Sequence, residues 1–181
     1  FCGMAFPGYQ YLGELLQRSE YRAPVEVIAN HLTRKWIKFT GVESTKLEEL
    51  TKAFEEFGVR ECFRLAAIHD GAFGRGQIFI RIKGQDGPRR RLPLPIEDGK
   101  IVQGSLVGFK NIEPIWTTPY AYNSQDPTLP DFYRPDRWYI MGVETHADRL
   151  LTFIGKPLPD ILKPSYNFSG LSTSQLVEPY V

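Results

Sequence analysis

The spacing of apolar residues changes once along this chain, close to residue 75, and that change most constrains the fold. Before it, apolar residues recur every three or four positions, as on one face of an α-helix. After it, apolar and polar residues alternate, as in a strand with one buried face. Helices followed by strands are typical of an α+β domain with a mostly antiparallel sheet. We therefore expect a single α+β domain with a helical part (1–74), a strand-rich part (75–160) and a linker that starts a helix (161–181).

The first two helices are predicted from apolar spacing. Tyr9, Leu12, Leu15 and Leu16 predict a short helix. In the stretch APVEVIANHLTRKW, Pro24 suits the first helical position, because its missing N–H would be unpaired there in any case. The same stretch predicts one buried apolar stripe, formed by Val25, Ile28, Leu32 and Trp36.

Two further helices are expected before the change in spacing. TKLEELTKAFEEFG opens with a capping box, Thr45 to Glu48, and closes at Gly58, a residue suited to the left-handed conformation. VRECFRLAAIHDG resumes the helical spacing and is expected to end at Gly71. The apolar face expected for the first of these two helices contains Leu47, Leu50, Phe54 and Phe57.

The second half of the chain predicts strands joined by long loops rich in proline and tyrosine. QIFIRIKG, LVGFKNIEPIW, RWYIMGVET and RLLTFIG are the expected strands, and the first alternates like a half-buried one. Residues 117–137 show no periodicity, so we expect a long packed loop that contacts another chain. Ser172 is expected to begin a helix.

Composition excludes several classes of protein. The 181 residues include 22 Lys and Arg against 21 Asp and Glu, a formal net charge of +1, so any contact with DNA needs a local patch. Cys2 and Cys62 are too few for a disulfide framework and indicate buried thiols in a reducing compartment. No apolar run approaches the roughly 20 residues that span a bilayer, so no membrane contact is expected. Because the chain opens with Phe1 and ends as a helical pattern begins, we expect a fragment of a longer polypeptide.

No complete catalytic or metal site can be read from the sequence. The glycines of GAFGRGQIFI follow a helix and precede a strand, the reverse of a phosphate-binding loop, so we expect a turn with positive φ. His31, His69 and His146 are too widely spaced to predict a metal site, and we expect neither metal nor cofactor. Glu55 and Glu56 are adjacent helix-surface charges.

Two histidines nevertheless suggest hypotheses. The stretch HLT at 31–33 matches half of the paired His-x-Thr motifs of two-histidine phosphodiesterases, but His146 is followed by Ala147 and Asp148, so a second copy is absent. We interpret His146 as part of a structural corner, in which an Asp or Thr side chain caps a turn and Arg149 reaches a carboxylate or a backbone carbonyl. We therefore expect His146→Ala to reduce stability or assembly.

The run Arg89, Arg90 and Arg91 is the one concentrated positive charge in the sequence. It could contact phosphate or an acidic neighbouring subunit, because arginine favours planar, bidentate partners. A solvated loop is an equally good interpretation.

Four stretches together resemble the portal proteins of tailed bacteriophages, in particular a prophage-associated branch whose N-terminal region is also linked to anti-CBASS phosphodiesterases. They are YRAPVEVIANHLTRKWIKF, GRGQIFIRI, THADRLLTFIGKPLP and FSGLSTSQLVEPYV, where Gly-x-Ser opens a long helix in the family. The resemblance spans roughly residues 9–181. The positions that mark the family, called marker residues below, are Thr33, Arg34, Trp36, His146, Arg149, Phe153 and Gly155.

This resemblance implies a structural, non-enzymatic role. The chain would be the wing-like outer part of a portal subunit, and the whole protein a homo-oligomeric, typically dodecameric ring at one capsid vertex. Such a ring passes double-stranded DNA during packaging and ejection, and docks the terminase and the head-tail connector proteins. The implied location is the virion, and the host cytoplasm during assembly. Two alternatives remain open: a two-histidine phosphodiesterase that uses His31, and a nucleic-acid-binding accessory module that uses Arg89 to Arg91.

Overall fold

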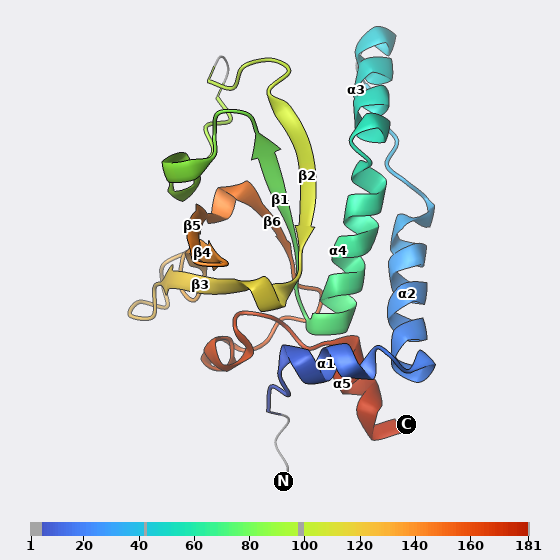
Figure 1. The fold of residues 1–181 in the computed structure, drawn as a ribbon, viewed down its shortest axis with the longest axis vertical. Helices are drawn as coiled ribbons and strands as arrows, with labels where there is room; N and C mark the ends of the chain where they lie inside the picture. The colour runs from blue at the N-terminus through green and yellow to red at the C-terminus, as the bar shows by residue number, and fades with distance from the viewer. Residues whose placement is uncertain (1–4, 42, 98–99, 181) are drawn as a thin grey trace.

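The computed structural model describes residues 5–41, 43–97 and 100–180. Within them, four α-helices precede the strands and a fifth follows (Figure 1). The helices are α1 (Tyr9–Leu15), α2 (Ser19–Arg34), α3 (Ser44–Glu56), α4 (Val59–Phe73) and α5 (Thr173–Val177). The strands are β1 (Gly76–Ile82), β2 (Leu106–Ile112), β3 (Thr117–Tyr122), β4 (Pro135–Ile140), β5 (Val143–His146) and β6 (Leu150–Phe153). Helices first and antiparallel strands afterwards confirm the α+β class.

In the described part of the chain, the strands form two antiparallel three-stranded sheets where one was expected. The first sheet has the order β2-β1-β6 and the second β3-β4-β5. The stretch RWYIMGVET is a hairpin and not one strand, because Met141 and Gly142 turn the chain at positive φ, 49° and 82°. The two sheets pack through a core of Phe79, Trp138, Leu150 and Phe168.

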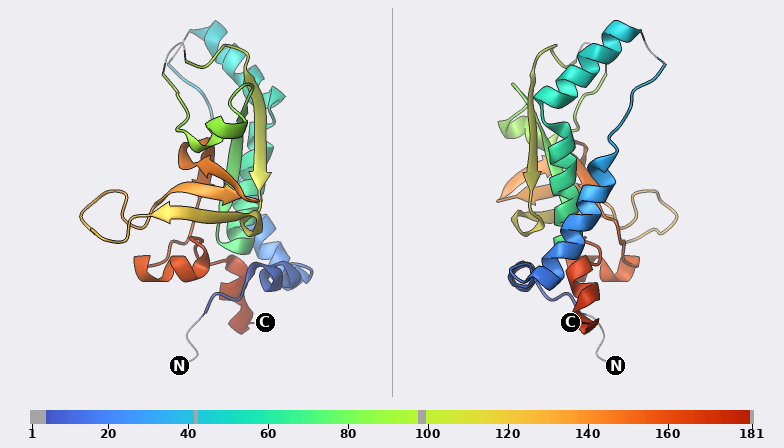
Figure 2. Two further views of the ribbon diagram at one scale, coloured as in Figure 1. Left: turned by 60° about the vertical axis from the view of Figure 1, so that its left-hand side comes forward. Right: turned by 90° about the vertical axis from the view of Figure 1, so that its right-hand side faces the viewer.

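The first sheet is the middle layer of the molecule. Phe79 faces the second sheet, so its neighbour Ile78, fully buried, faces the opposite side, where α4 packs against β1. Figures 1 and 2 show α2 and α4 on that side and β3 and β4 on the other. Because both faces are covered, the first four residues of β1 are all buried, and the expected half-buried alternation is wrong there.

The predicted buried stripe of α2 is only partly correct. Val25 is buried, but Ile28 and Leu32 are 47% and 68% exposed. The face that meets α4 instead carries residues four apart, and a Cβ on Gly71 would lie 2.8 Å from Val25. The helices thus cross where α4 has no side chain. The buried residues of α2 are Tyr21, Val25, Ala29 and Thr33.

Three predicted helix ends also differ. Pro24 lies inside α2, which begins at Ser19 after Arg18 without a side-chain cap. The predicted capping box is wrong, because α3 begins at Ser44 and its N-cap residue Glu43 accepts no such bond through its side chain. Gly71 lies within α4, which continues to Phe73.

Other predicted ends are confirmed. Gly58 is left-handed between α3 and α4, at φ 58°. The expected positive-φ turn before the first strand is formed by Gly74, at φ 82°. The Ser172 side chain accepts a hydrogen bond from the Gln175 N–H and caps α5. In the described residues α5 has five residues and continues as a 3-10 turn, Glu178–Tyr180.

The predicted loop 117–137 contains regular structure. It begins with β3, and its end pairs as β4, so the irregular connection is limited to 123–134. The tyrosines that suggested a loop instead pack across strands, as in the pair Tyr120 and Tyr139, whose ring centroids are 5.0 Å apart. This connection projects from the body of the molecule (Figure 2).

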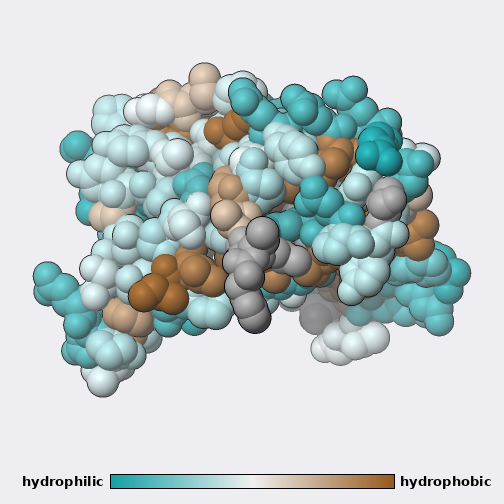
Figure 3. Space-filling model, turned by 90° about the horizontal axis from the view of Figure 1, so that it is seen from below, coloured by the Kyte–Doolittle hydropathy of each residue, from teal (hydrophilic) through white to brown (hydrophobic). Residues whose placement is uncertain are grey.

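The helices α1 and α5 close one end of the molecule. Leu12, Leu15 and Tyr21 form a second core there, against Phe73 and Val177 among others. Seen from this end, hydrophobic side chains form separate patches among hydrophilic ones (Figure 3).

Candidate functional site

Two marker residues that are far apart in sequence meet through one aromatic side chain. Phe63 of α4 packs edge-on against Trp36, which follows α2, and against Phe153 of β6, at centroid distances of 5.6 and 5.4 Å. A hollow of about 470 Å³ beside them is also lined by Thr33 and Gly155. The sequence predicted these residues as family markers, and the fold places them around this hollow.

Gly155 is held by a carboxylate in this region. Its N–H donates a hydrogen bond of 2.9 Å to Oδ1 of Asp70, and a Cβ at this position would lie 2.5 Å from Oδ2. Burial raises the pKa of Asp70, while the Gly155 N–H and the Lys156 charge oppose that rise. The marker glycine therefore allows β6 to end close against α4.

Thr33 and Arg34 are markers whose backbone carbonyls end α2. Arg60 of α4 donates from Nε to the Thr33 carbonyl at 3.0 Å and from Nη2 to the Arg34 carbonyl at 3.3 Å. A guanidinium at a helix C-terminus satisfies carbonyls that have no partner within the helix. This contact therefore fixes the end of α2 against α4.

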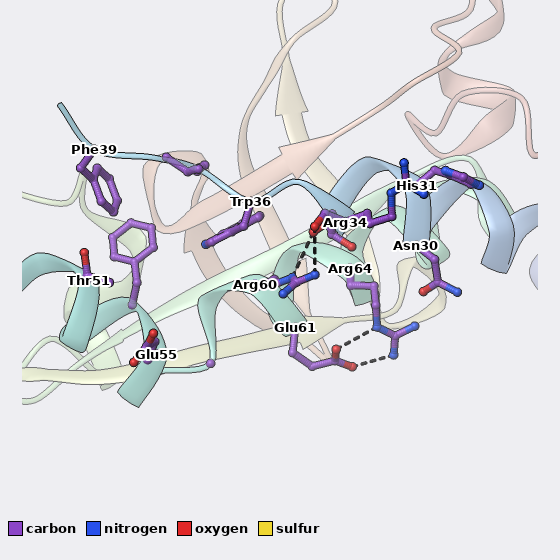
Figure 4. A pocket seen from close by; sticks show the side chains of 14 residues that line it. Asn30, His31, Arg34, Trp36, Phe39, Thr51, Glu55, Arg60, Glu61 and Arg64 are labelled. Atoms are coloured by element: carbon purple, nitrogen blue, oxygen red, sulfur yellow. Dashed lines mark hydrogen bonds and ion pairs between the residues drawn. The ribbon is translucent and has the colours of Figure 1, made fainter.

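A larger cleft of about 810 Å³ opens beside that contact, between α2, α3 and α4 (Figure 4). Its aromatic wall includes Phe39 and Phe54, whose rings meet edge-on at 5.0 Å. Arg64 binds Glu61 through two hydrogen bonds of 2.6 and 2.8 Å, and these bonds lower the pKa of Glu61. Arg60 and Arg64 already donate to acceptors within the protein. They therefore stabilise the walls of the cleft and are not free to bind a charged ligand.

His31 also lines this cleft, but it does not form a phosphodiesterase pair with Thr33. Residues two apart on a helix point about 200° away from each other. Accordingly His31 is exposed, whereas Thr33 is buried and its hydroxyl donates to the Ala29 carbonyl at 3.0 Å. The His-x-Thr chemistry needs both side chains free for one substrate, and although Thr33 also lines this cleft, its hydroxyl is bonded to its own helix.

The corner at His146 is confirmed, with a different capping group. A 3-10 turn, Ala147–Arg149, follows β5, and Nδ1 of His146 accepts a 3.2 Å hydrogen bond from the Asp148 N–H. Arg149 also donates hydrogen bonds to backbone carbonyls, as expected. This guanidinium, 2% exposed, donates to the carbonyls of Leu92 and Gln85 and to the Gln85 side chain. Burial lowers the pKa of Arg149.

The three consecutive arginines have three different environments. Arg90 lies over the Phe79 ring, with Cζ 4.7 Å from the centroid, and donates to the Thr145 hydroxyl at 3.0 Å. Arg89 is exposed and donates to the Gly84 carbonyl, and Arg91 is exposed. Only Arg89 and Arg91 are therefore oriented to meet a partner.

Arg75 is a functional candidate that was missed in the sequence. It is fully buried, donates to the carbonyls of Asn167, Pro114 and Thr117, and donates to the Thr117 hydroxyl at 2.7 Å. Burial lowers its pKa to about 10. Its signal was present: an arginine between two glycines at the start of an apolar strand must find acceptors inside the protein.

Other candidates for chemistry are isolated in the part of the chain that the structure describes. No three His, Cys, Asp or Glu side chains there gather as a metal site requires. Cys62 is partly buried, which raises its pKa, and Cys2 lies outside the described residues. Among the described helices, none combines the length and apolarity needed to cross a bilayer.

The comparison with known families agrees with this structural character. A family model described as phage portal protein matches residues 9–181. No curated protein matches the sequence. The family match covers all five helices and all six strands of the described residues. The chain belongs to the phage portal protein family, whose members are structural components of the phage particle.

Proposed function

We propose that this chain is part of the subunit of a portal ring at one capsid vertex. The proposal is supported by the contacts that the marker residues make inside the protein. Trp36 and Phe153 pack, Thr33 and Arg34 offer carbonyls to Arg60, and Arg149 bonds to backbone. These packing contacts and backbone hydrogen bonds hold a rigid shape, which is what an assembly subunit requires.

The proposed ring is homo-oligomeric, with the dodecamer as the expected form. It would let double-stranded DNA pass during packaging and ejection, and would join the head to the terminase and later to the connector proteins. In that ring the described residues would form the wing-like outer part. The finished ring would reside in the virion after assembly in the host cytoplasm.

The test is the mass and shape of the natural full-length protein. Light scattering after size exclusion gives the mass, and negative-stain images show whether particles have a central hole. Rings with a hole support the proposal. A compact monomer at micromolar concentration contradicts it.

The two-histidine phosphodiesterase receives no support from the geometry around His31 and Thr33. Incubation of the purified protein with cyclic dinucleotides tests it directly. Turnover that His31→Ala abolishes would contradict a purely structural role.

The nucleic-acid accessory module is tested by a salt titration of DNA affinity, comparing the natural protein with Arg89→Ala/Arg91→Ala. Each lost phosphate contact reduces the salt slope by about one. An unchanged slope excludes the module.

A further inference from the structure

Charges of opposite sign gather on two separate surfaces, although the formal net charge of the chain is only +1. The first surface lies on α3, which has no buried residue. Its solvent side carries Glu48, Glu49, Glu55 and Glu56, all exposed, around Lys52. The other lysine of α3, Lys46, pairs with Glu43 at 3.3 Å. We call these four glutamates the acidic surface. Among the described residues, none of them forms an ion pair.

The second surface surrounds the end of β1 and the 3-10 turn η1 (Gly87–Arg91). Four exposed cations lie there, with Asp86 as an acidic neighbour, and none of the four forms an ion pair with a described residue. The hydrogen bond from Arg89 to the Gly84 carbonyl joins the turn to the end of the strand. We call these cations the basic surface: Arg81, Lys83, Arg89 and Arg91.

The basic surface also carries exposed apolar side chains. Leu92 is 54% exposed and Ile96 is 81% exposed, directly after the turn. The basic surface thus offers apolar contact together with charge, as protein interfaces do.

The two surfaces lie on opposite sides of the molecule. Phe79 and Arg81 share one face of β1, Lys83 follows directly after the strand, and Phe79 packs against the second sheet. The helix α4 packs against the other face of β1, and α3 continues from α4 through Gly58. Figures 1 and 2 show α3 and the turn at 87–91 on either side of β1 and β2.

We infer that the acidic surface of one subunit docks on the basic surface of the next copy of the same chain. The inference rests on the proposed ring. A closed ring needs head-to-tail contacts, in which each subunit offers two different, complementary surfaces. Opposite charges on opposite sides meet that requirement, steer the encounter and disfavour contacts between identical surfaces.

DNA is a weaker partner for the same charges. Phosphates could bind the basic surface, but they would leave the glutamates of α3, on the opposite side of the molecule, without a partner. A second copy engages both surfaces at once. The near-neutral chain also lacks the excess positive charge that supports binding along DNA.

Charge reversal in the full-length protein tests the inference. Glu48→Lys/Glu55→Lys reverses the acidic surface, and Arg89→Glu/Arg91→Glu reverses the basic one. Each double variant should lower the fraction of subunits found in rings by about tenfold at low salt, because like charges then face each other. The combined fourfold variant should restore rings, since its two surfaces are again opposite in sign.

A mixture provides a second and independent readout. Each double variant repels itself, but the two attract each other at both contacts, so an equal mixture should form alternating rings when the subunit number is even. The matched control is Glu14→Lys/Glu113→Lys, which makes the same change of net charge at exposed positions outside both surfaces. The control should assemble like the natural protein. Circular dichroism verifies that all variants are folded.

The outcomes separate this inference from the proposed function. If the natural protein forms no rings, the proposed function fails. If it forms rings and the double variants do so equally well, or the fourfold variant and the mixture both fail to recover, only this inference is wrong. Loss of DNA affinity without loss of rings in Arg89→Glu/Arg91→Glu would assign the basic surface to nucleic acid and overturn it.

Discussion

The guanidinium of Arg75 lies over the indole ring of Trp138, with Cζ 4.3 Å from the ring centroid. Arg75 comes just before β1 of the first sheet, and Trp138 is a buried residue of β4 in the second. The contact joins the two sheets at their shared core. Cation–π attraction and hydrogen bonds to carbonyls replace the carboxylate that a buried arginine commonly has.

We expect Arg75→Lys to lower the free energy of unfolding by about 3 kcal/mol, because one ammonium cannot serve the four acceptors that the guanidinium now bonds. Urea unfolding measures the loss. Arg81→Lys, at an exposed position, is the control and should cost less than about 0.5 kcal/mol. Equal losses in the two variants would show that the buried network contributes little.

The second prediction concerns the contact of Gly74 with Gly170. The Gly170 N–H donates to the Gly74 carbonyl at 2.7 Å, and a Cβ on Gly74 would lie 2.1 Å from the Gly170 oxygen. Gly104 has a similar φ, 76° against 82°, but open space around it. Gly104→Ala should therefore cost only the strain of a positive φ, about 1 kcal/mol, and Gly74→Ala about 3 kcal/mol more.

Thermal and urea unfolding of both alanine variants measure this difference. Similar stabilities would mean that the segments around Gly74 and Gly170 can separate to admit the methyl group without a loss of stability. A large loss only in Gly74→Ala would establish the close approach between the start of β1 and the segment before α5.

His146→Ala should lower the free energy of unfolding by about 1 kcal/mol, the usual value of a lost cap. His146→Asn keeps a short polar side chain that can accept from the Asp148 N–H, so most of the stability should return. Urea unfolding of the two variants makes the comparison. If asparagine is no better than alanine, packing of the imidazole ring and not its hydrogen bond holds the corner.

Stability should fall in mild acid because of His69. Burial lowers the pKa of this histidine, partly opposed by Glu113 and by a hydrogen bond with the Ile112 backbone, and its Nδ1 has no partner among the described residues. The unfolded chain takes up a proton as the pH falls through about 6.5, and the folded chain does so only at lower pH. A fall in pH through this range therefore stabilises the unfolded state more than the folded state, and the free energy of unfolding decreases.

The measurement is the free energy of unfolding at pH 7.5 and at pH 5.5. The natural protein should lose more stability over this interval than His69→Leu does. His31→Gln removes an exposed histidine and should leave the loss unchanged. A loss of the same size in His69→Leu would assign the acid sensitivity to other groups.

Most element types could be predicted because they depend on residues a few positions apart. Helical spacing in the first part, alternation after Gly76, the left-handed Gly58 and the Ser172 cap are all local. Helix starts were less predictable. Thr45 to Glu48 had the pattern of a capping box with Thr45 as the N-cap residue, yet the N-cap residue of α3 is Glu43, two residues earlier.

The sequence by itself determined the α+β class, the order of helices and strands, and the lack of a readable catalytic motif. Only the tertiary structure decided which side of each element is buried. Ile28 and Leu32 fit a core pattern but face outward. The buried face of α2 is instead the one that carries Val25, because α4 packs closely against it at Gly71. Arg75 and Arg90 are buried or packed for a related reason, since acceptors and aromatic rings from distant segments surround them. A side chain's environment is the sum of contacts with residues far away in sequence, which local periodicity does not contain.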